Sequence, residues 1–461
     1  MDLLHGTVDK ILVCGRTLPA QVIDQAPGSA GPPGSYGLPE RAMRGQLKGR
    51  ILLVLAVPGG RRADWGVMVR IRVSAGLLLV GLAMAVQGCS PLPVSAWTQA
   101  LGDAGHSSSN PGETVLTART VATLHRTWSA QRLVDSAVVD GDQVFTTEQV
   151  DVDHAVLVDR VLDTGRVRWT YPLAVGVAHQ VVADGAGSTV YVGSFQYGSQ
   201  TSAYGTVLAA VNQVTGLPRW VQPRRPGGLG LTFGGDRLYL DRPEGMTTAL
   251  DPTGRALWTS PMTGGGGSYA SGRYFTAGVV LDAATGARLW RYDEQPAFLP
   301  TGDVVSGTRM IVGGANGLDN NANSGAFAWY STTGCGHPLC SWTGAVQTPS
   351  RQYSPMAAQA DTVLAWTFSG VQAYSLVTGR LLWQETSDSD MLQSWIAGDL
   401  VWTLDQTSTL RAYRLGGCGA TVCPPVSALP PAPGTLSQSG LTARGTVLTW
   451  GIGGVYAAAA R

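Results

Sequence analysis

The chain has 461 residues, of which 61 are Gly, 26 are Pro and 14 are Trp, and only 14% are charged. This composition favours many short strands joined by tight turns over long amphipathic helices. The formal net charge is +1, so no strong field draws the chain to nucleic acid.

Residues 1–67 are rich in Pro and Gly, as in the stretch QAPGSAGPPGSYGLPERA, and show no lasting helical or strand period. An export signal follows this segment, although such a signal normally begins a chain. We therefore interpret residues 1–67 as a disordered extension or as the result of a wrongly assigned start.

Residues 68–88 have the features of a lipoprotein signal peptide. A basic start at Arg70 and Arg72 precedes a largely apolar run that ends at Val86. The run is shorter than the roughly 20 residues of a spanning helix. It ends in VQGCS, which resembles a bacterial lipobox, although Gln87 stands where a small residue is usual. We predict lipidation of Cys89 and anchoring at the outer face of the cell membrane, with an uncleaved anchor or a buried helix as the alternative.

Residues 89–115 separate this signal from the rest of the chain. They are rich in Ser, Gly and Pro, a composition typical of flexible linkers. We therefore expect a flexible tether, followed by a folded domain over residues 116–461.

A short pattern recurs five times in this domain, as LDTGRVRW, NQVTGLPRW, LDPTGRALW, LDAATGARLW and SLVTGRLLW. In each copy a Trp follows a Gly by four residues: Gly165/Trp169, Gly216/Trp220, Gly254/Trp258, Gly286/Trp290 and Gly379/Trp383. The pattern indicates a hairpin in which Gly accepts a positive φ at the turn and the next strand carries a large aromatic residue.

Trp128 and Trp342 extend this series, which then has spacings of 41, 51, 38, 32, 52 and 41 residues. Such periods are typical of four-stranded propeller blades. The 333 residues after Trp128 accommodate eight units of about 42 residues, and the last unit lacks a Trp strand. We predict an all-β, eight-bladed propeller closed by the strand of Trp128, with seven blades as the alternative. The rings are expected to pack between blades as core: Trp128, Trp169, Trp220, Trp258, Trp290, Trp342 and Trp383.

Two cysteine pairs lie in enlarged turns, CGHPLC at Cys335 and Cys340 and CGATVC at Cys418 and Cys423. Each pair can face across its turn, so we predict two disulfides, which require an oxidising compartment. A four-cysteine zinc site is the alternative, but a whole blade separates the two turns. Free catalytic thiols are a further alternative, for which no base partner is visible.

The D-x-x-T-G-x-x-x-W units resemble the quinoprotein-type, or PQQ-like, β-propeller repeat over residues 115–461. That family includes PQQ-dependent alcohol dehydrogenases and the lipoprotein subunit of the outer-membrane assembly machine. The resemblance implies that an enzyme of this family would hold its quinone under an adjacent Cys-Cys ring, beside calcium on carboxylate and amide side chains. This sequence has no Cys-Cys pair and no acidic set that matches. We therefore expect no catalytic residues, no metal and no cofactor, and keep PQQ with calcium as the alternative.

Two long loops, residues 194–207 and 313–325, are expected on the face opposite the Thr-Gly turns. Their side chains suit recognition of a protein or glycan, with simple length variation as the alternative; the residues in question are Tyr197, Tyr204, Asp319, Asn321 and Asn323. The sequence thus predicts an exported, lipid-anchored propeller that acts as a protein-binding or scaffold module at the cell surface. A PQQ-dependent dehydrogenase or a carbohydrate-active propeller enzyme is the alternative.

Overall fold

The computed structural model describes residues 10–13 and 16–19, and residues 95–460 with gaps at 152–153, 174–177, 197–204, 227–229, 243–244, 262–265, 277, 293–299, 315–324, 349–351, 368–369, 386–390 and 432–435. The chain forms two compact units, Met1–Leu92 and Pro93–Arg461. In the first unit, β1 (Lys10–Val13) pairs with β2 (Arg16–Pro19) as an antiparallel hairpin. The predicted signal at 68–88 and Cys89 lie outside the described residues.

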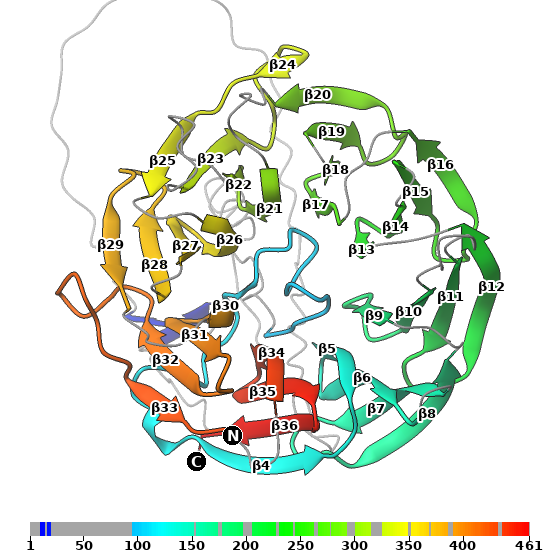
Figure 1. Ribbon diagram of the computed structural model, residues 1–461, viewed down its shortest axis with the longest axis horizontal. Coiled ribbons are helices and arrows are strands. Elements are labelled where there is room, and N and C mark those ends of the chain that lie inside the picture. The colour runs from blue at the N-terminus through cyan, green and yellow to red at the C-terminus, as the bar shows by residue number, and fades with distance from the viewer. Residues whose placement is uncertain are drawn as a thin grey trace, which may run out of the picture. The chain divides into compact units, whose positions relative to one another are not determined.

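In the described part of the second unit, eight antiparallel sheets follow one another around a ring, and each is built on four strands (Figure 1). The first strand of each blade is innermost and the last is outermost. Blades 1 to 4 contain β5 (Val134–Asp140), β6 (Gln143–Gln149), β7 (Ala155–Val161) and β8 (Val167–Leu173); β9 (Ala178–Ala183), β10 (Thr189–Gln196), β11 (Gly205–Asn212) and β12 (Pro218–Pro226); β13 (Gly230–Gly234), β14 (Arg237–Arg242), β15 (Met246–Leu250) and β16 (Ala256–Ser260); and β17 (Ser268–Ala270), β18 (Arg273–Thr276), β19 (Val279–Asp282) and β20 (Arg288–Tyr292).

The remaining blades follow the same order of strands. Blades 5 to 8 contain β21 (Pro300–Ser306), β22 (Arg309–Gly314), β23 (Gly325–Ser331) and β25 (Gly344–Thr348); β26 (Gln352–Gln359), β27 (Thr362–Thr367), β28 (Gly370–Ser375) and β29 (Leu381–Gln384); β30 (Met391–Ala397), β31 (Leu400–Asp405), β32 (Leu410–Arg414) and β33 (Ser427–Leu429); and β34 (Leu436–Ala443), β35 (Thr446–Ile452), β36 (Gly454–Ala459) and β4 (His125–Ala130). One short helix, η1 (Val121–Thr123), precedes β4 in the described chain. None of the helices in the described residues has the length and apolar character to cross a membrane.

The ring is closed by strands from the two ends of the propeller. β4 pairs antiparallel with β36 and places Trp128 opposite Ala457, so blade 8 is completed by residues that precede blade 1 in the sequence. Closure leaves no blade with an open interface at the seam. The prediction of an all-β, eight-bladed propeller closed by the strand of Trp128 is therefore confirmed.

Apolar side chains from facing sheets form the core between neighbouring blades. Between blades 1 and 2, for example, Phe145 and Leu157 pack against Val181 and Val190. Inner and central strands are buried on both faces, as in β31, where every residue is buried. Outer strands alternate instead, because only one of their faces meets the next blade.

The Trp rings of the outer strands lie on a Gly in the turn between the third and fourth strands of the following blade. A Cβ atom on Gly165 would come within 2.5 Å of the Trp128 ring, and one on Gly216 within 2.7 Å of the Trp169 ring. The same relation joins Trp220 to Gly254, Trp258 to Gly286, Trp290 to Gly334 and Trp383 to Gly417. Five of these indole N–H groups donate to a backbone carbonyl of that turn at 2.7–3.1 Å: Trp128, Trp169, Trp220, Trp258 and Trp383. Each pair therefore fixes the distance between two blades.

Trp342 differs from the other six. It lies just before β25 and packs, half-buried, against the core between blades 4 and 5. On the next turn, a Cβ atom of Gly379 would meet Val346 at 3.3 Å and no Trp ring. The enlarged cysteine turn has displaced this Trp from the outer strand.

Both predicted disulfides, Cys335–Cys340 and Cys418–Cys423, are present. Each closed loop lies back on the outer strand of the preceding blade. β24 (Leu339–Cys340) pairs in parallel with β20, and Val422 forms a parallel bridge to Gln384 at the end of β29. The two cross-linked loops thus cover part of the outer edges of blades 4 and 6.

The flexible tether that we predicted over residues 89–115 is wrong for its described part, residues 95–115. We call residues 97–110 the strap; Figure 1 shows this segment in light blue inside the ring of inner strands. Trp97 is fully buried, and Ser108 and Asn110 are 1% and 2% exposed. Small residues, which usually signal a mobile linker, here let the main chain approach the inner strands closely. The folded domain therefore begins near residue 95.

Candidate functional site

The strap meets the inner strand of every blade, and its main-chain carbonyls do so in blade order. Its carbonyl oxygens accept hydrogen bonds from six inner strands: Val139 N to Trp97 O (2.7 Å), Ala183 N to Thr98 O (2.8 Å), Tyr269 N to Ala104 O (2.6 Å), Val305 N to Gly105 O (2.8 Å), Ala358 N to Ser107 O (2.9 Å) and Ile396 N to Ser108 O (2.9 Å). β3 (Ser109–Asn110), at the end of the strap, also pairs in parallel with β30.

Two amide side chains of the strap contact the remaining two blades. Gln99 donates to the carbonyl of Phe233 at 2.7 Å and accepts from its N–H at 3.0 Å, in blade 3. Asn110 donates to the carbonyl of Thr442 at 2.8 Å, in blade 8. An amide group carries both a donor and an acceptor, so it can replace a peptide unit on the edge of a strand.

The contacted residues occupy equivalent places in the eight blades. Each is the last or second-to-last residue of its inner strand. The strap therefore lies where the first strand of each blade turns into the second, at one mouth of the central channel. Because the strands are antiparallel, the Thr-Gly turns between third and fourth strands lie at the same end.

The side chain of His106 extends from the strap into a buried polar cluster between blades 3 and 4. Its Nε2 lies 3.2 Å from Thr232 Oγ1, which itself donates to the carbonyl of Gly267 at 2.6 Å. Since the Thr232 proton is used, His106 Nε2 must be the donor, and this selects one tautomer. Burial lowers the pKa of His106 to about 4, so the ring is neutral at pH 7.

The same cluster contains two carboxylates. Asp241 accepts hydrogen bonds from the hydroxyl groups of Thr247 at 2.6 Å and Tyr274 at 2.7 Å, and from Gly267 N at 2.6 Å. Burial raises the pKa of Asp241 and raises that of Asp303 to about 7, with the charge of Asp241 adding to the second shift. Among the described residues, no three His, Cys, Asp or Glu side chains form a group suited to hold a metal ion. The cluster is a hydrogen-bonded network that ties the strap to the blades.

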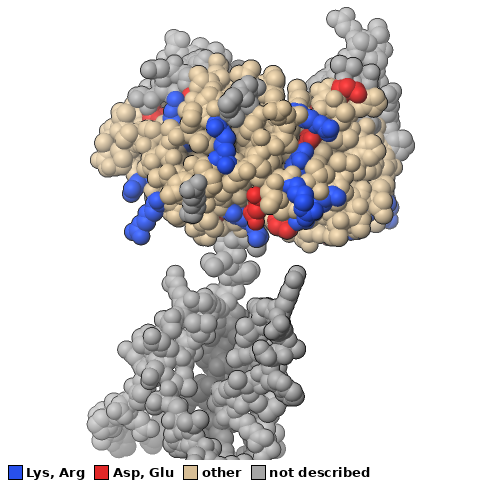
Figure 2. Space-filling view, turned by 90° about the horizontal axis from the view of Figure 1, so that it is seen from below, with Lys and Arg blue, Asp and Glu red and all other residues tan. Residues whose placement is uncertain are grey.

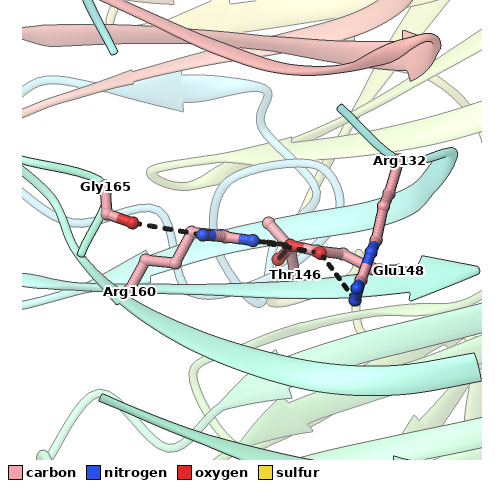
Figure 3. Close-up of polar contacts among 5 residues, drawn as sticks. All are labelled: Arg132, Thr146, Glu148, Arg160 and Gly165. Atoms are coloured by element: carbon pink, nitrogen blue, oxygen red, sulfur yellow. Dashed lines mark hydrogen bonds and ion pairs between the residues drawn. The ribbon is translucent and has the colours of Figure 1, made fainter. Parts of the chain in front are cut away.

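A buried ion pair joins strands β6 and β7 of blade 1 (Figure 3). Glu148, which is fully buried, accepts from Arg160 Nη2 at 2.8 and 3.0 Å and from Thr146 Oγ1 at 2.8 Å. Arg160 also donates to the carbonyl of Gly165 at 3.1 Å, and Arg132 lies 3.9 Å from the carboxylate. Arg132 belongs to the connection between β4 and β5, so the pair links the closing strand to blade 1.

The strands that flank the predicted recognition loops, β10 with β11 and β22 with β23, are joined at the end of their blades opposite the strap. Tyr197, Tyr204, Asp319, Asn321 and Asn323 lie outside the described residues, so their role stays a prediction. On the described surface, charged side chains often pair with the opposite sign, as in Arg168–Asp142 at 2.6 Å and Arg309–Asp361 at 2.7 Å. Figure 2 shows acidic groups interspersed among basic ones on the side in view.

Sequence patterns did not reveal the strap. Its residues follow neither a strand nor a helix period, and their partners lie up to 332 positions away in the chain. One signal was present, because Trp97 and Leu101 are bulky residues within a segment otherwise typical of a linker. A mobile tether has no reason to carry them.

Solved structures with the same architecture are distant in sequence. A computationally designed protein, Ika8, matches with a TM-score of 0.56 and 11% identity, over 72% of this chain and 98% of that one. BamB from Moraxella catarrhalis matches with a TM-score of 0.50 and 15% identity, over 73% of this chain and 97% of that one. A quinohemoprotein alcohol dehydrogenase, ADHIIG from Pseudomonas putida HK5, matches with a TM-score of 0.51 and 12% identity, over 79% of this chain and 80% of that one. At these identities the likeness shows the fold alone.

No curated protein matches the chain. One family model does match it, over residues 95–274 and again over residues 203–416. Its description is outer membrane protein assembly factor BamB, and the two matches together span residues 95–416, more than half of the chain. The chain therefore belongs to this BamB-like family of PQQ-like β-propeller repeats.

Proposed function

We propose that this protein is an exported, lipid-anchored propeller that binds a protein partner and acts as a scaffold at the outer face of the cell membrane. The observation that carries the proposal is the strap, which fills one mouth of the channel with the protein's own chain. A propeller closed in this way offers its outer surface and its loops, rather than that mouth, to other molecules. Membership of the BamB family supports the same reading.

The alternative, a quinone-dependent dehydrogenase, does not fit the residues described. The resemblance implies an adjacent Cys-Cys ring over the quinone, whereas both disulfides here join cysteines five positions apart at the outer edges of blades. The strap's own carboxylate, Asp103, accepts from Ser107, and in the cluster beside His106 the carboxylate of Asp241 is already bonded to three donors. We therefore derive no reaction step through a quinone.

The proposed anchor is tested by labelling cells with a fatty acid. Wild-type protein should take up the label and fractionate with membranes, and Cys89→Ala should do neither. The matched control is Cys335→Ser with Cys340→Ser, which removes two cysteines outside the lipobox and should leave labelling unchanged. A wild-type protein without label would refute the anchor.

The proposed binding role is tested by affinity capture from native membranes with the mature chain as bait. The same partner should be recovered in repeated experiments, and Tyr197→Ser with Tyr204→Ser should reduce its recovery if the loop of residues 194–207 is the contact. Purified protein is also mixed with PQQ and calcium. Dye reduction above that of protein alone would contradict the scaffold role and support the alternative, a quinone-dependent dehydrogenase.

A further inference from the structure

We propose that the strap is a clasp that binds all eight inner strands as one unit, so that the mouth of the channel opens as a whole or stays closed. A local plug would need contacts with one or two blades. The strap contacts all eight, and blade number rises from 1 to 8 along its main-chain carbonyls and the side chains of Gln99 and Asn110. Two side chains also reach back to earlier blades, His106 to Thr232 in blade 3 and Ser109 to Gln359 in blade 6.

The strap also has a structure of its own. Its Asp103 carboxylate accepts from Ser107 N at 3.1 Å and from Ser107 Oγ at 2.8 Å. The carbonyl of Leu101 accepts from Ser108 N at 2.8 Å. These bonds join the two arms of the segment, so a disturbance at one contact is transmitted to the others.

Two residues of the strap are held in a strained backbone conformation. His106 has φ +53° and Ser108 has φ +46°, the left-handed region that L-residues enter at a cost. Such conformations persist only where surrounding contacts determine them. Here the contacts are those of Ser107 and Ser108 with blades 6 and 7. Loss of the contacts would release the strain, which favours complete release over partial release.

The order of contacts makes the clasp specific for a complete ring. Both ends of the strap lie beside the seam, since Trp97 bonds to blade 1 and Asn110 to blade 8. A ring with a missing or displaced blade would leave part of the strap without donors. The chain therefore has two closures, β4 on the outer edge of blade 8 and the strap at the inner edge of every blade.

The test uses the full chain with Gly105→Val. A Cβ atom at Gly105 would lie 2.6 Å from the carbonyl of Val305, so the larger side chain must push the strap away from blade 5. The control is Gly416→Ala, because a Cβ atom at Gly416 would have no atom within 4 Å. Hydrogen exchange is measured at the strap's donors in blades 1, 2, 4, 5, 6 and 7: Val139, Ala183, Tyr269, Val305, Ala358 and Ile396.

A single clasp predicts that exchange at all six amides rises together, by at least tenfold, while amides inside the blades keep their protection. The Gly416→Ala control should exchange like wild type. A rise confined to Val305 and its neighbours in blades 4 and 6 would overturn the proposal, because the strap would then be a chain of independent contacts. Unchanged exchange at all six would overturn it too.

A second variant covers the case in which Gly105→Val does not fold. Gln99→Ala with Asn110→Ala removes only side-chain bonds: those to blades 3 and 8, and the bond from Asn110 to Ser95 Oγ at 3.1 Å. A clasp that acts as a unit should then lose protection at Val305 and Ala358, which neither side chain touches. Protection unchanged at these two amides would contradict a single unit.

Discussion

At the scale of single residues, Glu148 shows how the fold places a charge where water is excluded. Its carboxylate is fully buried and depends on one bidentate partner, Arg160. A buried pair adds little net stability, because desolvation of the two ions offsets their attraction. Removal of Arg160 is different, since it leaves the buried Glu148 carboxylate with only the half-exposed Arg132, at 3.9 Å, as a cationic partner.

We therefore expect Arg160→Leu to lower the free energy of unfolding by roughly 3–5 kcal/mol. The double variant Glu148→Leu/Arg160→Leu should recover most of this loss, because neither charge remains. Urea unfolding of the two single variants and the double variant gives the coupling between them. A double variant as unstable as Arg160→Leu would mean that packing, and not charge, is what Arg160 supplies.

His106 gives the protein a defined dependence on pH. Burial lowers the pKa of His106 to about 4, below the ordinary value of 6.5 that it regains on unfolding. Above pH 6.5 the ring is neutral in both states, and its contribution to stability is fully present. As the pH falls towards 4, the unfolded chain takes up a proton that the folded chain does not, so stability is lost, by roughly 3 kcal/mol in total.

The variant His106→Gln keeps a donor for Thr232 and does not titrate. Above pH 6.5 its free energy of unfolding should differ from that of wild type by a constant. Below that pH the free energy of unfolding of wild type should fall relative to that of the variant. The comparison must be made against the variant because Asp303 acts in the opposite direction. Its pKa is raised from 3.8 to about 7, so its contribution is present below pH 3.8 and is lost as the pH rises to about 7. A pH-independent difference would exclude His106 as the titrating group.

At the scale of elements, the contact between Trp and Gly joins one blade to the next. Gly216 has φ +69° and lies under the Trp169 ring, so it is required for two reasons, backbone conformation and space. Gly187 has nearly the same φ, +71°, and a Cβ atom there would meet nothing within 4 Å. Comparison of variants at Gly216 and Gly187 therefore separates the effect of backbone conformation from the effect of space under the Trp ring.

Gly187→Ala should cost only the roughly 1–2 kcal/mol of a left-handed L-residue. Gly216→Ala should cost at least about 1 kcal/mol more, because Trp169 must move from its turn. Thermal unfolding of the two variants measures the difference, and tryptophan fluorescence reports whether the indole environment changes only in Gly216→Ala. Equal losses would show that the ring is free to move aside.

The disulfide loops are elements that protect strand edges. Cys335→Ser with Cys340→Ser should cost only about 2 kcal/mol, because the closed loop is short. The sharper expectation is local. Arg291 N donates to Pro338 O at 2.9 Å in the closed loop, so its hydrogen exchange should rise in this variant. In the matched variant Cys418→Ser with Cys423→Ser, the amide of Gln384, which donates to Thr421 O at 2.8 Å, should respond instead. Unchanged exchange at both amides would show that the loops hold the edges without their cross-links.

The sequence allowed elements to be predicted where the residues that make a contact recur at fixed spacing. The Gly and Trp of each unit predict a turn and an outer strand, and the six outer-strand Trp rings lie on the turn of the following blade. The exception, Trp342, follows from four extra residues in the cysteine turn, whose effect on the strand depends on how the loop packs. The addition of β24 to β20 had no signal either, because a pairing between blades depends on their arrangement in space.

At the scale of the whole molecule, the number of blades could be derived from chain length and period, because each blade needs a similar number of residues. The strap could not be derived this way. It has no repeat partner, its contacts are with eight separate strands, and its small residues are those of a linker. Composition describes what a segment does alone, whereas the strap is ordered by surfaces that exist only when the ring is complete.

Successive truncations should separate the two closures. A chain that begins at Pro93 retains the whole second unit, so we expect it to unfold at the same temperature as the full chain. A chain that begins at Thr114 lacks the strap but keeps β4, and should keep the oligomeric state of the full chain with a lower unfolding temperature. A chain that begins at Gln131 lacks both closures and exposes the edge of β36.

That last chain should associate, because β36 offers unpaired main-chain groups beside buried residues such as Val455 and Ala457, and a free edge of this kind pairs with other chains. Size-exclusion chromatography and thermal unfolding of the three chains give the comparison. A chain from Gln131 with the oligomeric state and the unfolding temperature of the full chain would mean that neither closure matters. A loss of stability only between Thr114 and Gln131 would assign closure to β4 alone and leave the strap without a structural role.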